Sequence, residues 1–116
     1  MNSDLEKLRI YSAYVDMMFY FYKLTDKFPK HEKVSIASDI KRTLNDGIRH
    51  IINAQKCYSI RDRISYLNLL DCDLKVLKVY IRICYKGKYI TSKNYGASCR
   101  KITNVNGFMI GWIRSC

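Results

Sequence analysis

The sequence predicts an all-α protein with the architecture of an antiparallel, up-and-down four-helix bundle. One proline and five glycines in 116 residues leave too few turn signals for the many short strands of an all-β fold. Apolar residues recur at intervals of three and four, which is the spacing of one face of an α-helix. Four segments of about 20 to 25 residues carry this pattern, and loops of only about 3 to 6 residues join them, so neighbouring helices must run antiparallel. We expect residues 1–116 to form one domain around one core.

The first helix is expected to bury one apolar stripe in the bundle and to use a second face elsewhere. The stripe that we assign to the bundle consists of Leu8, Tyr11, Val15, Met18, Tyr22 and Phe28. Residues 17–22 are apolar on every side of such a helix. So much apolar surface predicts one contact within the bundle and one with another subunit.

The second and third helices carry the clearest stripes. Pro29 separates the second helix from the first, because proline disfavours helix in the residue before it and suits the first helical turn. The second helix has the stripe Val34, Ala37, Ile40, Leu44, Ile48 and Ile51. The third has the stripe Ile64, Leu67, Leu70, Leu74, Leu77, Ile81 and Cys84. Ser59 and Asp62 form a plausible capping pair at its start, and Gly87 can end it.

The fourth helix is expected to begin after an N-cap at Thr91-Ser92. Its apolar stripe consists of Tyr95, Cys99, Ile102, Val105, Met109 and Ile113. Gly107 and Gly111 are spaced four residues apart and precede Trp112, the one tryptophan. A glycine inside a soluble helix costs about 1 kcal/mol relative to alanine, so this spacing predicts a close approach between helices, with Gly107, Gly111 and Trp112 serving packing.

The charge of the chain predicts a polyanionic partner. Lys and Arg number 21 against ten Asp and Glu, which gives a net charge of +11. All of the excess lies after the first quarter of the chain, and the last quarter has no acid. So many like charges repel one another unless a polyanion neutralises them. We therefore expect RNA, single-stranded DNA or an acidic protein as the partner.

The other composition signals favour a reduced, cytoplasmic compartment. The cysteines are odd in number, at five, and lack the spacing of a zinc site, so we expect neither a metal nor a cofactor. The sequence shows no signal peptide, and its longest apolar run is much too short for a membrane span.

Several cations are candidates for phosphate contacts. Lys75, Lys78, Arg82 and Lys86 step by three and four along the third helix, which places them on one side over about 16 Å. No acid lies between Lys75 and Lys86 on that side, so we expect this basic row to be free for a phosphate chain. Five further cations extend the positive field around the last turn and the fourth helix: Lys88, Lys93, Arg100, Lys101 and Arg114.

Aromatic residues interleave with these cations. Tyr80, Tyr85 and Tyr89 lie beside Lys86 and Lys88 in the sequence. Tyrosine rings next to cations can stack on unpaired bases, which favours single strands. Tyrosine is also a common packing and interface residue, so both roles stay open for these three positions.

The sequence does not predict an enzyme. Acid–base or nucleophilic catalysis needs groups that converge, and the ten acids are spread singly with basic neighbours. The Arg-x(4–6)-His signature of helical HEPN ribonucleases is also missing around His31 and His50.

Four segments together resemble a known superfamily. They are residues 22–33, residues 77–83, residues 90–95 and the closing residues 111–115. These segments are similar to the four-helix-bundle superfamily that contains the accessory variability determinant (Avd) proteins of diversity-generating retroelements and the proteins encoded in intervening sequences of 23S ribosomal RNA genes. The third helix resembles the Avd branch, in which a basic residue, a bulky trio and an arginine follow one another, here from Lys78 to Arg82.

The resemblance implies a function without catalysis. It implies a basic homo-oligomer, a pentamer in this superfamily, that works with the retroelement's reverse transcriptase and its template RNA. Two alternatives stay open. One is an RNA-binding protein of a 23S intervening sequence, and the other is a scaffold for an acidic protein.

Overall fold

Four long helices make up the chain, with no strand in the part that the structure describes. The structure is a computed structural model; it describes the backbone of residues 2–116 and the side chains of residues 7–31 and 35–116. The first helix is α1 (Asn2–Asp26). The second begins with α2 (Lys30–Glu32), passes through a π-helical turn η1 (Lys33–Ala37) and continues as α3 (Ser38–Lys56). The third is α4 (Ile60–Lys86) and the fourth is α5 (Ser92–Ser115).

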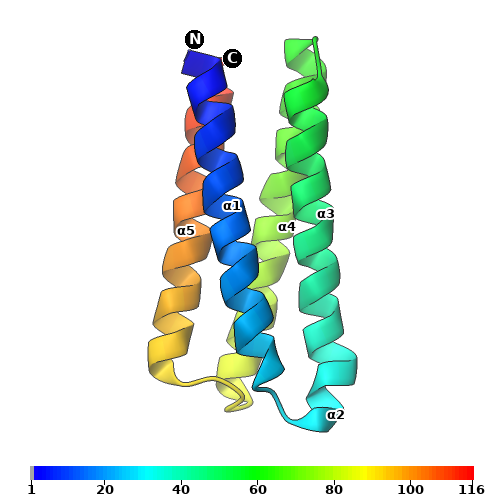
Figure 1. Ribbon diagram of the computed structural model, residues 1–116, viewed down its shortest axis with the longest axis vertical. Coiled ribbons are helices and arrows are strands. Elements are labelled where there is room, and N and C mark those ends of the chain that lie inside the picture. Colours follow the sequence, from blue (N-terminus) through cyan, green and yellow to red (C-terminus); the bar gives the residue numbers. More distant parts are fainter. Residues whose placement is uncertain (1) are drawn as a thin grey trace.

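The helices run alternately down and up, which confirms the four-helix bundle. Figure 1 shows the chain ends together at one end of an elongated molecule that measures 44 × 23 × 18 Å. α1 packs against α3 and α5, and α4 packs against the same two helices. Helices α1 and α4 therefore lie at diagonal corners of the bundle and run in the same direction (Figure 1).

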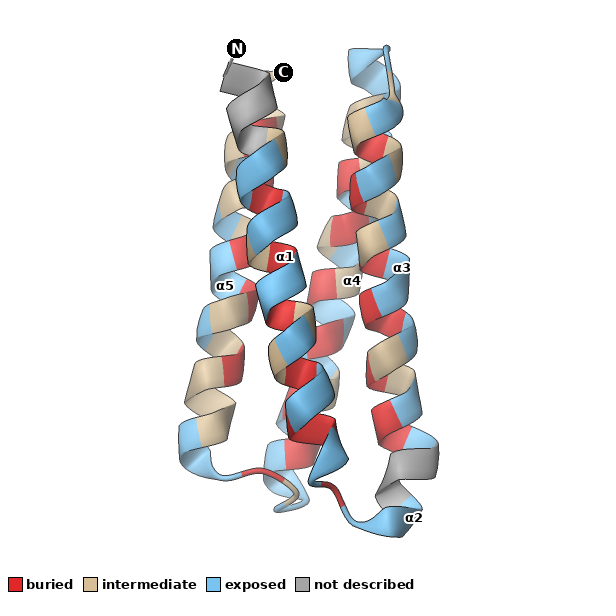
Figure 2. Cartoon of the chain, in the orientation of Figure 1, coloured by how far each residue is buried: buried red, intermediate tan, exposed pale blue. Residues whose placement is uncertain are grey.

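The apolar stripes predicted for the last three helices lie in the core (Figure 2). On α4, the six residues from Leu67 to Cys84 are buried as predicted, and Ile64 is half-buried at the end. On α3 and α5 most members of the stripes are buried, while Ile48, Tyr95, Cys99 and Ile113 are half-buried. Val34, which we also placed on the second stripe, lies outside the described side chains.

The stripe predicted for α1 is wrong apart from Phe28. Four of its members, Leu8, Tyr11, Val15 and Tyr22, are between 36% and 63% exposed, and Met18 is half-buried. The core side of α1 instead consists of Ile10, Tyr14, Met17, Phe21 and Leu24. Two apolar stripes at helical spacing occur on this one helix, and the spacing of a single helix does not tell which of them faces the other helices.

The helix ends are set by residues that satisfy free backbone groups. The hydroxyls of Ser59 and Thr91 accept hydrogen bonds from the backbone N–H groups of Asp62 and Asn94, which confirms both predicted N-caps. Gly87 is the C-cap of α4, as predicted, but the left-handed residue that turns the chain is Lys88, with φ of 64°. The N–H of Lys88 donates to Tyr85 O and that of Tyr89 to Cys84 O, which is a Schellman motif.

Candidate nucleic-acid interface

The predicted basic row lies on the outer side of α4, toward α5. Lys75, Lys78, Arg82 and Lys86 are all exposed. Lys75 and Lys78 line a small hollow between the two helices, together with Ile102 and Asn106 of α5. Three of the four cations, Lys78, Arg82 and Lys86, form no ion pair with any acid among the described side chains. These three present uncompensated charge.

Lys75 departs from the expectation of a free row. Its Nζ lies 2.6 and 2.7 Å from the two carboxylate oxygens of Asp71, one turn earlier on the same helix. Asp71 lies just before the interval from Lys75 to Lys86 that the prediction of an acid-free row covers. The pair is solvent-exposed and weak, but the carboxylate of Asp71 offsets the charge of Lys75 at this end of the row.

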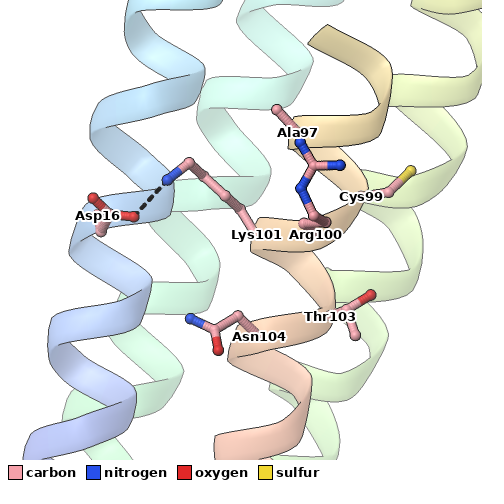
Figure 3. Close-up of a pocket in the computed structure, with 7 residues that line it drawn as sticks. All are labelled: Asp16, Ala97, Cys99, Arg100, Lys101, Thr103 and Asn104. Atoms are coloured by element: carbon pink, nitrogen blue, oxygen red, sulfur yellow. Dashed lines mark hydrogen bonds and ion pairs between the residues drawn. The ribbon is translucent and has the colours of Figure 1, made fainter. Parts of the chain in front are cut away.

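Lys101 is also engaged within the subunit. Its Nζ donates to Asp16 Oδ2 of α1 at 2.7 Å, and it lies 5.4 Å from the centre of the Tyr20 ring. Figure 3 shows Lys101 reaching across to Asp16 over a shallow groove of about 710 Å³. Arg100, the residue before Lys101, lines the same groove and is exposed. Lys101 therefore ties α5 to α1, and Arg100 is the cation that this face leaves for a ligand.

Lys88, Lys93 and Arg114 are exposed. Lys88 occupies the tip of the turn between α4 and α5, and Lys93 lies in the first turn of α5, which contains no acid. A cation at a helix N-terminus opposes the helix dipole, so Lys93 does not stabilise its own helix. Arg114 lies in the last turn of α5, where its charge suits the dipole. Lys88 and Lys93 thus form, with Arg82 and Lys86, a basic end of the bundle.

The three candidate tyrosines are used mainly within the subunit. Tyr89 packs at 5.9 Å against the buried ring of Phe28, and Tyr80 is half-buried against the core. Tyr85 is 41% exposed and stacks on Tyr95 at 4.5 Å with an interplanar angle of 11°. One face of the Tyr85 ring is therefore occupied. Of the three, Tyr85 is the residue with most surface left for a base.

The comparison with known families decides what kind of bundle this is. The model of the family described as bAvd-like matches residues 8–116. The chain belongs to the bAvd-like family. This confirms the resemblance to Avd proteins and supports an Avd-type accessory protein in general. No curated protein matches the chain.

A solved structure has the same fold. The bAvd-like chain is similar to a crystal structure of a protein of unknown function from the S23 ribosomal protein family of Bacteroides thetaiotaomicron. The sequences are 18% identical, the match covers 98% of this chain and 99% of that chain, and the TM-score is 0.83. The likeness shows a shared fold. In the described part of this chain, none of the helices has the length and apolar character needed to cross a bilayer.

The glycines of this bAvd-like chain differ from the expectation. Gly107 is exposed, and a Cβ added there would meet no atom within 4 Å, so no close helix approach occurs at Gly107 within the subunit. Trp112 is fully buried, in line with a packing role, and Gly111 beside it is half-buried. The close approach is at Gly47 of α3 instead, where a Cβ would lie 2.0 Å from the Tyr14 hydroxyl.

Polar groups that the sequence pattern did not reveal also join the helices to one another. His50 Nδ1 lies 2.5 Å from Asp73 Oδ2, which joins α3 to α4. Burial raises the pKa of Asp73, while the hydrogen bond and the charge of His50 act in the opposite direction. Burial likewise raises the pKa of Tyr14, with a smaller effect of Asp73. Among the described residues, no three His, Cys, Asp or Glu side chains gather as metal ligands.

Proposed function

We propose that this protein is a non-enzymatic accessory protein of a diversity-generating retroelement that binds template RNA or complementary DNA together with the reverse transcriptase. The observation that carries the proposal is a set of cations on the outer side of α4 and α5 that form no ion pair with an acid among the described side chains, namely Lys78, Arg82, Lys86, Lys88, Lys93 and Arg100. Membership of the bAvd-like family supports the retroelement context that we propose.

Binding rests on backbone charge. Each phosphate neutralised by a fixed cation releases a condensed counterion, so affinity falls steeply with salt and depends little on sequence. A homo-oligomer, which we propose to be a pentamer, raises the charge from +11 for one chain to about +55. A long nucleic acid touches several subunits at once, and affinity grows accordingly.

The test compares two variants that lose the same charge from different faces. In the first, Lys78, Arg82 and Arg100 are each changed to Gln. In the second, Lys27, Arg49 and Lys56, which are exposed elsewhere, are changed to Gln. Affinity for single-stranded RNA is measured between about 50 and 300 mM salt. The first variant should lower the slope of log K against log salt by about 2, since each contact to a single strand contributes about 0.7.

Two outcomes contradict the proposal. Equal losses in both variants would show that net charge alone attracts RNA, and a flat salt response of the unmodified protein would remove the electrostatic mechanism.

Purification from the native host, with identification of bound polypeptides and RNA, tests the reverse transcriptase contact. A gene position inside a 23S ribosomal RNA gene, instead of beside a reverse transcriptase gene, would favour the ribosomal alternative. A protein that copurifies with an acidic polypeptide and no nucleic acid would favour the scaffold alternative.

A further inference from the structure

Two exposed apolar stripes lie at diagonal corners of the bundle. The α1 stripe consists of Leu8, Tyr11, Val15, Phe19 and Tyr22. The α4 stripe consists of Leu69, Cys72, Val76, Val79 and Ile83, spaced three, four, three and four residues apart. Leu8 is 63% exposed, Phe19 62% and Val79 57%, so neither stripe is covered within the subunit. Exposed apolar rows of this length mark an interaction surface.

We infer that the α1 stripe of one subunit packs on the α4 stripe of a second copy of the chain, with the two helices parallel. The inference rests on the homo-oligomer in the proposed function and specifies the surfaces that form it. In a twofold-symmetric contact, by contrast, each stripe would pack on the same stripe of the second copy.

The two stripes match in level along the bundle. Lys101 of α5 reaches Asp16 of α1, and the next residue, Ile102, shares a hollow with Leu74 and Lys75 of α4. Asp16 is therefore level with Leu74 and Lys75. Because α1 and α4 run in the same direction (Figure 1), Val15 of one upright subunit falls beside Cys72 and Val76 of its upright neighbour.

The charges at the ends of the stripes are complementary. The α1 stripe continues one turn further to Asp26, which lines the apolar groove around Phe19 and Tyr22. The α4 stripe continues to Lys86. Asp26 and Lys86 are both exposed and without an ion-pair partner among the described side chains. Asp26 is ten residues past Asp16 and Lys86 is eleven past Lys75, so parallel packing brings the two charges to the same level. A parallel contact of α4 with α4 would instead set Lys86 against Lys86.

The directions of the stripes favour a closed ring. At about 100° per residue, each stripe is centred about 140° to 150° from the core side of its helix. Both are displaced toward α3, since Tyr22 of the α1 stripe bonds to Asn45, and Asp73, between the core and the α4 stripe, bonds to His50. The two faces are thus splayed by about 110°, close to the angle that a ring of five copies requires. In such a ring α3 faces the axis, and the basic side of α4 with α5 faces outward.

Cysteine pairing tests the contact directly. Cys57, Cys99 and Cys116 are changed to Ser, which leaves Cys72 on the α4 stripe and the buried Cys84. Val15→Cys in this background should be joined to Cys72 of another copy by a short bismaleimide, giving a ladder of covalent oligomers. Thr103→Cys, exposed on α5, is the matched control and should give no ladder. Cys72→Ser leaves one exposed thiol in each chain, so covalent dimers that persist in that variant would show α1-to-α1 contact and overturn the inference, as would equal yields for V15C and T103C.

A mixing experiment gives an independent result. Phe19→Glu and Val79→Glu should each convert the oligomer to a monomer in light scattering, without loss of helical content. When the two variants are mixed at high concentration they should form dimers, because one keeps a working α4 stripe and the other a working α1 stripe. Monomers in the mixture, or an oligomer that survives both substitutions, would contradict the inference. If the oligomer survives both substitutions with unchanged RNA affinity, the proposed function would stand, but the assignment of the α1 and α4 stripes as the subunit contact would fail.

Discussion

The hydroxyl of Tyr14 lies in the space that the missing side chain of Gly47 leaves on α3. Tyr14 is fully buried and its hydroxyl donates to Leu44 O at 2.7 Å. An alanine Cβ at position 47 would lie 2.0 Å from the hydroxyl oxygen of Tyr14 and 2.7 Å from the ring carbon that bears this hydroxyl. Glycine at this position therefore lets α1 and α3 approach around a buried hydrogen bond.

Gly47→Ala should lower the free energy of unfolding by about 1–3 kcal/mol. Displacing Tyr14 costs overpacking strain and its hydrogen bond, and together these outweigh the gain of about 1 kcal/mol in helix propensity. Gly107→Ala is the matched control, because that glycine is helical and has open space. It should raise the free energy of unfolding by about 1 kcal/mol. Chemical denaturation followed by circular dichroism measures both, and equal signs for the two variants would refute the packing role of Gly47.

Arg63 should be a structural cation, so its removal is expected to destabilise the fold without weakening RNA binding. Its Nε donates to Ala54 O at 3.0 Å and one Nη donates to Cys57 O at 2.7 Å, at the C-terminal end of α3. Its guanidinium lies 5.8 Å from the centre of the Trp112 ring. Arg63→Ala should cost about 2 kcal/mol in thermal or chemical unfolding. Arg63→Lys should recover only part of this, because lysine lacks the planar fork. A loss of RNA affinity with unchanged stability would place Arg63 in the interface instead.

The core stripes of α3 and α5 could be predicted because each of these helices has one main apolar face, and that of α4 because its core stripe is the longer of two. On α1 the sequence offers two stripes, around Tyr14 and around Val15, and only the packing of other helices shows which is inside. The exposed α4 stripe around Val76 was not predicted, because the longer stripe around Leu74 already accounts for the apolar residues expected on one face of this helix. The exposure of Lys78, Arg82 and Lys86 on one side of α4 follows from their spacing. The ion pair of Lys101 with Asp16 could not be predicted, because it joins residues far apart in the sequence. The ion pair of Lys75 with Asp71 has the four-residue spacing of a helical pair, which is visible in the sequence.

Asp73 should make the protein less stable as pH rises from the acid side. Burial raises its pKa in the folded state, so between its unfolded pKa near 4 and the higher folded value the native protein binds more protons than the unfolded chain. The contribution of Asp73 to the free energy of unfolding is complete below the pKa of the unfolded state, and it is lost as the pH rises through the pKa of the folded state. The free energy of unfolding of the unmodified protein minus that of Asp73→Asn should therefore fall across this window. His50→Leu removes the two effects that lower the pKa and should move the fall to higher pH; a difference that rises with pH would contradict the assignment.

Lys88 should improve RNA binding at the expense of stability. It holds the left-handed position of the Schellman motif, with φ of 64°, where glycine is the residue without strain. Lys88→Gly should raise the free energy of unfolding by about 0.5–1 kcal/mol, and the same change should weaken RNA binding because the turn loses its exposed charge. Lys88→Gln separates the two effects, since it keeps the strain and removes the charge. It should lose affinity as Lys88→Gly does and gain no stability. If Lys88→Gly gained stability with full affinity, Lys88 would have no part in binding, and the basic end of the bundle would rest on Arg82, Lys86 and Lys93.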